Sequence, residues 1–263
     1  FTKLHFMEMR SSIFNFEVLS IQTDIPVVPP TATQVTIKIA ACGINPVAWK
    51  LRKGYIKAWP QTLPMVPGWD AAGVIAAVGK DVKDFKVGDE VFTYNRPAFD
   101  MKEMHPESAE EQMELNGCCA EYTTCESWKV AKKPTTLTMA QAGSVPLVAL
   151  TAYQGLMDQL NLKKTDTVLI LNASGGVGSY AVGIAKAHGA IVIGTCSERS
   201  SDYVKSLGAD HVVDYNKGSI SEQVATMTHL TIDCVYDCIG GDNTKEGEYS
   251  KRMERASRME HCS

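Results

Sequence analysis

A glycine-rich turn is the strongest chemical signal in the chain, because it follows an apolar run at residues 167–172 and opens a helix-like segment that ends near Gly189. The turn consists of Ala173, Ser174, Gly175, Gly176, Val177 and Gly178. In a strand, turn and helix of this kind, the first backbone N–H groups of the helix point at a phosphate. Side chains at Gly175 or Gly178 would block that approach, and Ala173 stands where the first glycine of the fingerprint usually lies. The six residues therefore predict a site for the pyrophosphate of a dinucleotide.

The identity of the dinucleotide depends on residues that follow the next apolar run, 190–194. That run ends about 20 residues after the turn, where such sites read the adenosine ribose. NAD sites place a carboxylate there, which accepts from the ribose 2′-OH and repels a 2′-phosphate. Here Ser197 and Arg199 can donate to a phosphate, after two uncharged residues. We therefore predict NADP(H), with Glu198 keeping NAD(H) as the alternative.

Composition limits the class of protein. The chain has 263 residues, of which 44% are hydrophobic and 21% charged, and its formal net charge is −4. This size allows two globular cores, and the charge does not favour nucleic acid. No apolar run reaches the roughly 18 residues that a membrane span needs. We predict a cytoplasmic protein with no membrane span, and because the chain begins with Phe1, import into an organelle stays open.

Two kinds of hydrophobic pattern alternate along the chain. Short, turn-rich strands in the first half, such as residues 35–40 and 74–78, favour a small barrel. After residue 135 helical and strand-like segments alternate, which is typical of a doubly wound parallel sheet. We predict an α/β protein with a barrel domain at 1–134, a nucleotide-binding domain at 135–243 and an atypical charged tail at 244–263.

Cysteine and histidine spacing argues against a metal site. None of the eight cysteines forms a C-x-x-C pair, and only Cys262, beside His261 in the tail, lies near a histidine. We expect the cysteines to be reduced and packed as small hydrophobic residues. The predicted metal content is therefore none.

Several motifs together resemble the medium-chain dehydrogenase/reductase superfamily over residues 13–243. They are the glycine-rich turn and residues 41–46, 66–73, 87–91, 117–122 and 151–153. The resemblance implies a GroES-like barrel, a Rossmann domain and a nicotinamide cofactor in the cleft between them. Zinc alcohol dehydrogenases have a cysteine where this chain has Asn45 and a histidine where it has Trp69. An amide and an indole cannot replace those ligands, so the chain resembles the zinc-free quinone oxidoreductase branch.

The resemblance also implies roles for individual side chains. Asn45 would lie beside the nicotinamide ribose and the substrate, where its amide can donate and accept, unless Asn-Pro only marks a turn. Tyr55 would donate to the substrate carbonyl or form a packed wall of the pocket. Thr151 would place a hydroxyl near the nicotinamide ribose, or only start a helix. Tyr215 would join Ser197 and Arg199 at the 2′-phosphate, with Arg199 as a solvated charge being the alternative.

The predicted function is zinc-independent reduction of quinones or α,β-unsaturated carbonyls by hydride transfer from NADPH. The alternatives are a non-catalytic NADPH-binding or structural protein and a zinc alcohol dehydrogenase. A homodimer is compatible with the resemblance. After Gly241 the chain departs from the family, which implies an incomplete Rossmann sheet with an exposed edge. We expect the charged tail to be disordered or loosely helical, because it carries little apolar surface.

Overall fold

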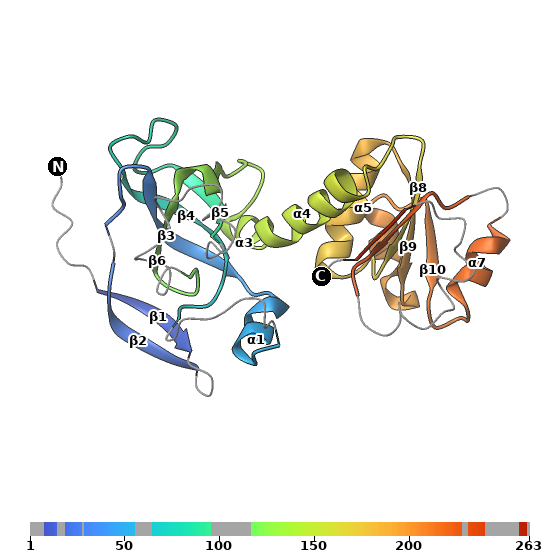
Figure 1. Cartoon of the computed structure of the whole chain (residues 1–263), viewed down its shortest axis with the longest axis horizontal. Coiled ribbons are helices and arrows are strands. Elements are labelled where there is room, and N and C mark those ends of the chain that lie inside the picture. Colours follow the sequence, from blue (N-terminus) through green and yellow to red (C-terminus); the bar gives the residue numbers. More distant parts are fainter. Residues whose placement is uncertain are drawn as a thin grey trace. The chain divides into compact units, whose positions relative to one another are not determined.

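The computed structural model describes residues 8–14, 19–27, 29–55, 65–95, 117–227, 231–239 and 258–261. It divides the chain into two compact units, Phe1–Leu147 and Val148–Ser263 (Figure 1). The first unit therefore ends later than the boundary that we predict at residue 134. The acidic segment 96–116 lies outside the described residues.

The first unit is built on antiparallel strands, as the short, turn-rich segments predict. Five strands form a sheet in the order β6-β3-β4-β5-β7, and β1 and β2 form a separate hairpin. The strands of this unit are β1 (Glu8–Phe14), β2 (Leu19–Pro26), β3 (Gln34–Gly43), β4 (Asp70–Val78), β5 (Glu90–Tyr94), β6 (Tyr122–Glu126) and β7 (Val130–Lys132). Apolar side chains on one face of the sheet form its core: Val35, Ile37, Ile75, Val91, Cys125 and Val130.

Two short helices of this unit are α1 (Pro46–Arg52) and α3 (Met139–Gly143). Thr138 starts α3 with a capping box, in which its hydroxyl accepts from the backbone of Gln141 and the Gln141 side chain reaches back. A Cβ on Gly43 would lie 2.6 Å from the carbonyl oxygen of Gly143, so only glycine lets α3 approach β3 this closely. This contact explains why the first unit runs past residue 134.

The second unit contains a five-stranded parallel sheet in the order β10-β9-β8-β11-β12. The strands are β8 (Thr167–Leu171), β9 (Ile191–Cys196), β10 (His211–Asp214), β11 (Cys234–Asp237) and β12 (Arg258–His261). The helices are α4 (Pro146–Tyr153), which begins at the end of the first unit, a π-helical segment (Gln154–Gln159), α5 (Gly176–His188), α6 (Ser201–Ser206) and α7 (Ile220–Thr226). The order of the first four strands reverses beside β8, the arrangement of a Rossmann sheet.

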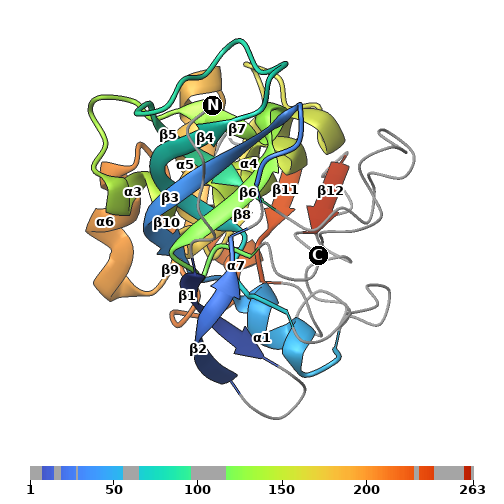
Figure 2. The ribbon, with the colours of Figure 1, turned by 90° about the vertical axis from the view of Figure 1, so that its left-hand side faces the viewer.

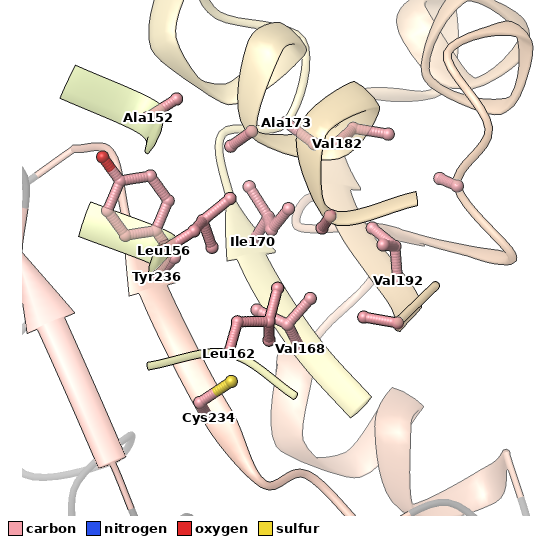
Figure 3. Packing of buried hydrophobic residues seen from close by; sticks show 14 of the residues in the cluster. Ala152, Leu156, Leu162, Val168, Ile170, Ala173, Val182, Val192, Cys234 and Tyr236 are labelled. Atoms are coloured by element: carbon pink, nitrogen blue, oxygen red, sulfur yellow. The ribbon is translucent and has the colours of Figure 1, made fainter. Parts of the chain in front are cut away.

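Side chains on the central strand β8 alternate between two cores, which is why helices cover both faces. Val168 and Ile170 pack with Ala181 and Val182 of α5, whereas Leu169 and Leu171 pack with residues of α7. Figure 3 shows the first core, with Val168 and Ile170 beside residues of α4, α5 and β11. A strand buried on both faces is typical of a doubly wound sheet, so the predicted fold class is confirmed.

The charged tail contributes the fifth strand, contrary to our expectation. Residues 258–261 form β12, which pairs in parallel with β11 from Cys234↔Arg258 to Asp237↔His261. The two strands run side by side in Figure 2. The prediction of a disordered or loosely helical tail is wrong for these residues, and the edge of β11 is covered. Pairing by backbone hydrogen bonds does not require the apolar side chains on which the prediction was based.

No helix in the described part of the chain is long and apolar enough to cross a bilayer.

Candidate functional site

Asn45 is fixed by a buried carboxylate. It is the N-cap residue of α1, yet its side chain does not cap that helix. Instead its amide Nδ2 donates to Oδ2 of Asp70 at 2.7 Å, while the backbone N–H of Leu147 donates to Oδ1 of Asp70 at 2.8 Å. The Asn-Pro pair does start a helix, but the amide itself is oriented by Asp70. The side-chain oxygen Oδ1 and the second N–H of Nδ2 are not used in this bond and can serve a ligand.

Asp70 has no exposed surface, and burial raises its pKa from 3.8 to about 6. The hydrogen bonds from Asn45 and Leu147 act in the opposite direction, because they stabilise the carboxylate. Asp70 is not among the site residues predicted from the sequence. A carboxylate directly before the apolar strand at residues 71–78 was the available signal.

A cavity of about 270 Å³ lies beside Asn45 within the first unit. Its described walls are mainly apolar, and Arg52 is the one charged residue among them. The main side chains are Ile44, Asn45, Trp49, Arg52, Trp69 and Cys119. Asn45, Trp49 and Arg52 share one helical face, because Trp49 lies four positions and Arg52 seven positions after Asn45. That spacing could have identified Arg52 from sequence.

Tyr55 lies near this cavity but is largely exposed. Its ring packs edge-on against Trp49, with ring centroids 5.7 Å apart. Trp49 is itself a wall of the cavity. The structure thus connects Tyr55 to the cavity through Trp49, and its role toward a substrate stays a prediction.

In the second unit the glycine-rich turn connects β8 to α5, as predicted. α5 begins at Gly176 and ends at His188, and Gly189 caps its C-terminus with a left-handed φ of 105°. A Cβ on Gly178 would lie 2.1 Å from the carbonyl oxygen of Asn172, and one on Gly175 would lie 2.5 Å from the Asn172 side chain. These two glycines therefore let the turn fold tightly under the helix. Ser174 lies in the same turn, and Gly176 and Val177 are the first two residues of α5.

Ala173 departs from the glycine fingerprint, and β9 accommodates it. Ala173 is fully buried, and its N–H donates to the carbonyl oxygen of Thr195 at 2.8 Å. A Cβ on Gly194 would lie only 2.8 Å from Cβ of Ala173. The glycine that this turn lacks at residue 173 is thus matched by a glycine on the neighbouring strand.

The residues predicted to hold a 2′-phosphate follow the ends of β9 and β10. Ser197 and Arg199 follow β9 directly, and Tyr215 follows β10, with its N–H donating to the carbonyl oxygen of Cys196. Lys217, which was not predicted from the sequence, lies beside them, with its Nζ 3.2 Å from Oε1 of Glu198. Because both side chains are exposed, this ion pair contributes little to the stability of the fold. Lys217 nevertheless offsets the negative charge of Glu198, the residue that kept NAD(H) as the alternative cofactor.

Thr151 lies in the sixth position of α4, so it does not start a helix. Its carbonyl oxygen accepts from the Tyr236 hydroxyl at 3.0 Å. A Cβ on Gly155 would lie 2.4 Å from the Tyr236 ring, so this glycine makes room for the ring. Thr151 belongs to the same unit as the glycine-rich turn, whereas Asn45 and Tyr55 belong to the other.

Donor chemistry at the two positions that bind zinc in zinc alcohol dehydrogenases is unsuited to a metal. Asn45 offers an amide that is already bonded to Asp70, and Trp69 is a buried indole 6.3 Å from the Tyr94 ring. Among the described residues, no group of three or more His, Cys, Asp or Glu side chains is placed to hold a metal ion.

Two sequence families match this chain. Residues 31–135 match the alcohol dehydrogenase GroES-like domain, and residues 176–247 match a family described as zinc-binding dehydrogenase. An NADPH-dependent alkenal/one oxidoreductase, chloroplastic, from Arabidopsis thaliana is 37% identical over 89% of this chain. A chloroplast envelope quinone oxidoreductase homolog from the same plant is 34% identical over 82% of it. The chain spans 58% and 63% of the length of these relatives.

A solved structure agrees with these sequence matches. The quinone oxidoreductase from Coxiella burnetii has a TM-score of 0.71 and is 30% identical, over 89% of this chain and 70% of that one. The chain belongs to the medium-chain dehydrogenase/reductase superfamily, in its quinone oxidoreductase-like branch.

Proposed function

We propose that this chain binds NADPH and reduces quinones or α,β-unsaturated carbonyls without zinc. The observation that carries the proposal is the cavity in which Asn45 and Trp69 replace zinc ligands. A conjugated acceptor needs less electrophilic assistance than an alcohol or a simple ketone, which depend on a Lewis acid. The names of the two plant relatives, an alkenal/one oxidoreductase and a quinone oxidoreductase homolog, support the same substrate class.

The cavity residues would bind and orient the acceptor. Trp49 and Trp69 offer flat apolar surfaces for a conjugated system, and Arg52 can donate to its carbonyl oxygen. The Asn45 amide is held by Asp70, so it can offer its remaining groups in a fixed direction. These contacts position the acceptor and exclude water, which accounts for much of the catalysis when the chemistry needs no metal.

The second unit would hold the cofactor. The first N–H groups of α5 and the glycine-rich turn fit a pyrophosphate, because Gly178 and Gly175 let the turn fold tightly against Asn172 at the start of the helix. Ser197, Arg199, Tyr215 and Lys217 would bind the 2′-phosphate. When bound, NADPH supplies a hydride to the electron-poor acceptor. The cytoplasmic location and the homodimer stay predictions.

The test is a turnover assay on the purified chain. NADPH is mixed with 9,10-phenanthrenequinone or a short 2-alkenal, and loss of reduced nicotinamide absorbance is followed. We expect oxidation of NADPH that depends on the acceptor and falls at least tenfold in Asn45→Ala. Lys53→Ala, an exposed change next to the end of α1, serves as the matched control and keeps its rate.

Binding of NADPH without turnover would contradict the proposal and support a non-catalytic nucleotide-binding protein. Stoichiometric zinc by elemental analysis would contradict zinc independence. Equal activity with simple primary alcohols would contradict the substrate class.

A further inference from the structure

Two cysteine sulfur atoms lie in contact beside the cavity. Cys42 Sγ and Cys119 Sγ are 3.5 Å apart, although 77 positions separate them in the sequence. Cys42 belongs to β3, and Cys119 follows Gly117 in the segment that leads into β6. Both thiols are half-buried and neither forms a disulfide in this structure. The proposed reduction assigns no role to them.

The surrounding backbone brings these two sulfur atoms together. Gly68 has a φ of 88°, and a Cβ on it would lie 2.7 Å from Cys119 Sγ and 2.9 Å from Cys42 Sγ. The Cys119 N–H donates to the carbonyl oxygen of Pro67 at 2.8 Å, and the Cys118 N–H donates to that of Gly68 at 2.7 Å. These bonds hold the second thiol against the loop whose glycine leaves space for both sulfur atoms.

The two thiols differ in reactivity. Cys119 lines the cavity, whereas Cys42 is not among its described lining residues. The hydrogen bond between the two thiols lowers the pKa of Cys119 and raises the pKa of Cys42. Since the thiolate is the nucleophile, Cys119 is the attacking sulfur and Cys42 the resolving one. Neighbouring Cys118 is fully buried, and burial raises its pKa well above the usual value.

We propose that Cys42 and Cys119 form a dithiol site which a hydroperoxide oxidises to an intrachain disulfide. The Cys119 thiolate attacks one oxygen of the peroxide, the O–O bond breaks, and the departing oxygen leaves as hydroxide or alkoxide. Cys119 is then a sulfenic acid. Cys42 attacks its sulfur, an S–S bond forms, and water leaves. In total, two thiols and one hydroperoxide give a disulfide, one water and one alcohol, or a second water when the oxidant is hydrogen peroxide.

The geometry needs only a local shift for this reaction. The sulfur atoms must approach from 3.5 Å to about 2.05 Å, the length of a disulfide bond. Both sulfur atoms are on adjacent backbone segments that already contact one another. The cross-link would join β3 to the Cys119 wall of the cavity, so oxidation and occupation of the cavity would be coupled at one side chain.

The experiment treats the reduced full chain with hydrogen peroxide and then alkylates the remaining thiols in denaturant. Peptide mass mapping is expected to find a Cys42–Cys119 cross-link, with the mass lower by two hydrogens, and a dithiol reductant is expected to reverse it. Cys118→Ser, the change next to the attacking thiol, is the matched control and should form the same cross-link. Cys119→Ser should lose it.

Cys42→Ser provides a measurement that does not depend on disulfide formation. Its Cys119 should stop at the sulfenic acid, which dimedone traps, because the resolving thiol is absent. Preferential linkage of Cys42 to Cys118 would overturn the proposal. So would a wild-type chain whose other cysteines oxidise while Cys42 and Cys119 both stay alkylatable. None of these readouts requires turnover, so they stand whether or not the proposed reductase activity is found.

Discussion

Among individual side chains, Asp70 makes the folded state sensitive to pH. Its pKa is about 6 in the folded chain and 3.8 as the ordinary value, because burial disfavours the carboxylate. Between these values the folded chain binds a proton that the unfolded chain has lost. The contribution of Asp70 to the free energy of unfolding therefore falls as the pH rises from about 4 to about 6, and is constant above that range.

Asp70→Asn should remove this component of the pH dependence. Denaturant unfolding at a series of pH values measures it, and the difference between variant and wild type should change through that interval and then level off. The matched control is Asp89→Asn, at an exposed turn between β4 and β5. A constant difference from pH 4 to pH 7 would contradict the raised pKa.

Arg199 should decide between the two nicotinamide cofactors. Arg199→Glu replaces a donor to the 2′-phosphate by a repelling charge, so we expect the KM for NADPH to rise at least tenfold while that for NADH is spared. A tenfold change corresponds to about 1.4 kcal/mol. Steady-state kinetics with both cofactors measures it. Equal effects on both cofactors would reject the assignment of the 2′-phosphate site.

The candidate site was only partly predictable because some partners are distant in sequence. The glycine-rich turn and Asn45 are local signals, since each depends on a short pattern. The bond from Asn45 to Asp70 joins residues 25 positions apart, and the ion pair of Lys217 with Glu198 joins two different strand ends. Cys42 and Cys119 were expected only to be reduced, small hydrophobic residues. Their contact depends on the fold of β3 and the loop at Gly68.

Among helices and strands, α5 allows a test of close packing against the turn. Gly178→Ala should destabilise the chain by about 1–3 kcal/mol, because the new Cβ would overlap the Asn172 carbonyl oxygen. Gly183→Ala is a matched change on the same helix, where nothing lies within 4 Å of the new Cβ. It should stabilise the chain by about 0.5–1 kcal/mol through helix propensity. Denaturant unfolding measures both, and equal effects would contradict the packing argument.

A second change in this region tests how β9 accommodates Ala173. Gly194→Ala should be destabilising, because its Cβ would lie 2.8 Å from that of Ala173. Ala173→Gly in the same chain should recover part of the loss, since it removes the opposing methyl group. The coupling free energy from a double-mutant cycle measures this. A coupling near zero would show that the two positions do not compete for the same space.

Strong periodic segments predicted the secondary structure well, and the weak ones did not. The strands β8 and β9 and the helix α5 follow from apolar runs and from glycine at both ends of the helix. β9 extends to Cys196, two residues beyond its apolar run, because Thr195 is buried by its hydroxyl contact with the Asn172 N–H. Helix α7 was not predicted, although Ile220 and Val224 lie one turn apart and fill the second core.

In the chain taken as a whole, the tail strand β12 determines whether β11 is an inner strand of the parallel sheet or its edge. A chain that stops at residue 257 lacks β12 and leaves one side of β11 unpaired. We expect amides of Cys234–Asp237 that face β12 to exchange faster with deuterium. We also expect the shortened chain to aggregate more readily, because the buried strand β11 would then be the edge and could pair with a second copy. Amides of β8, paired on both sides by β9 and β11, serve as the internal control. Hydrogen exchange with mass spectrometry measures the first effect and light scattering the second. Unchanged protection of β11 would contradict the pairing of β12. It would also mean that the charged composition of the tail, which predicted no regular structure, was the better guide to these residues.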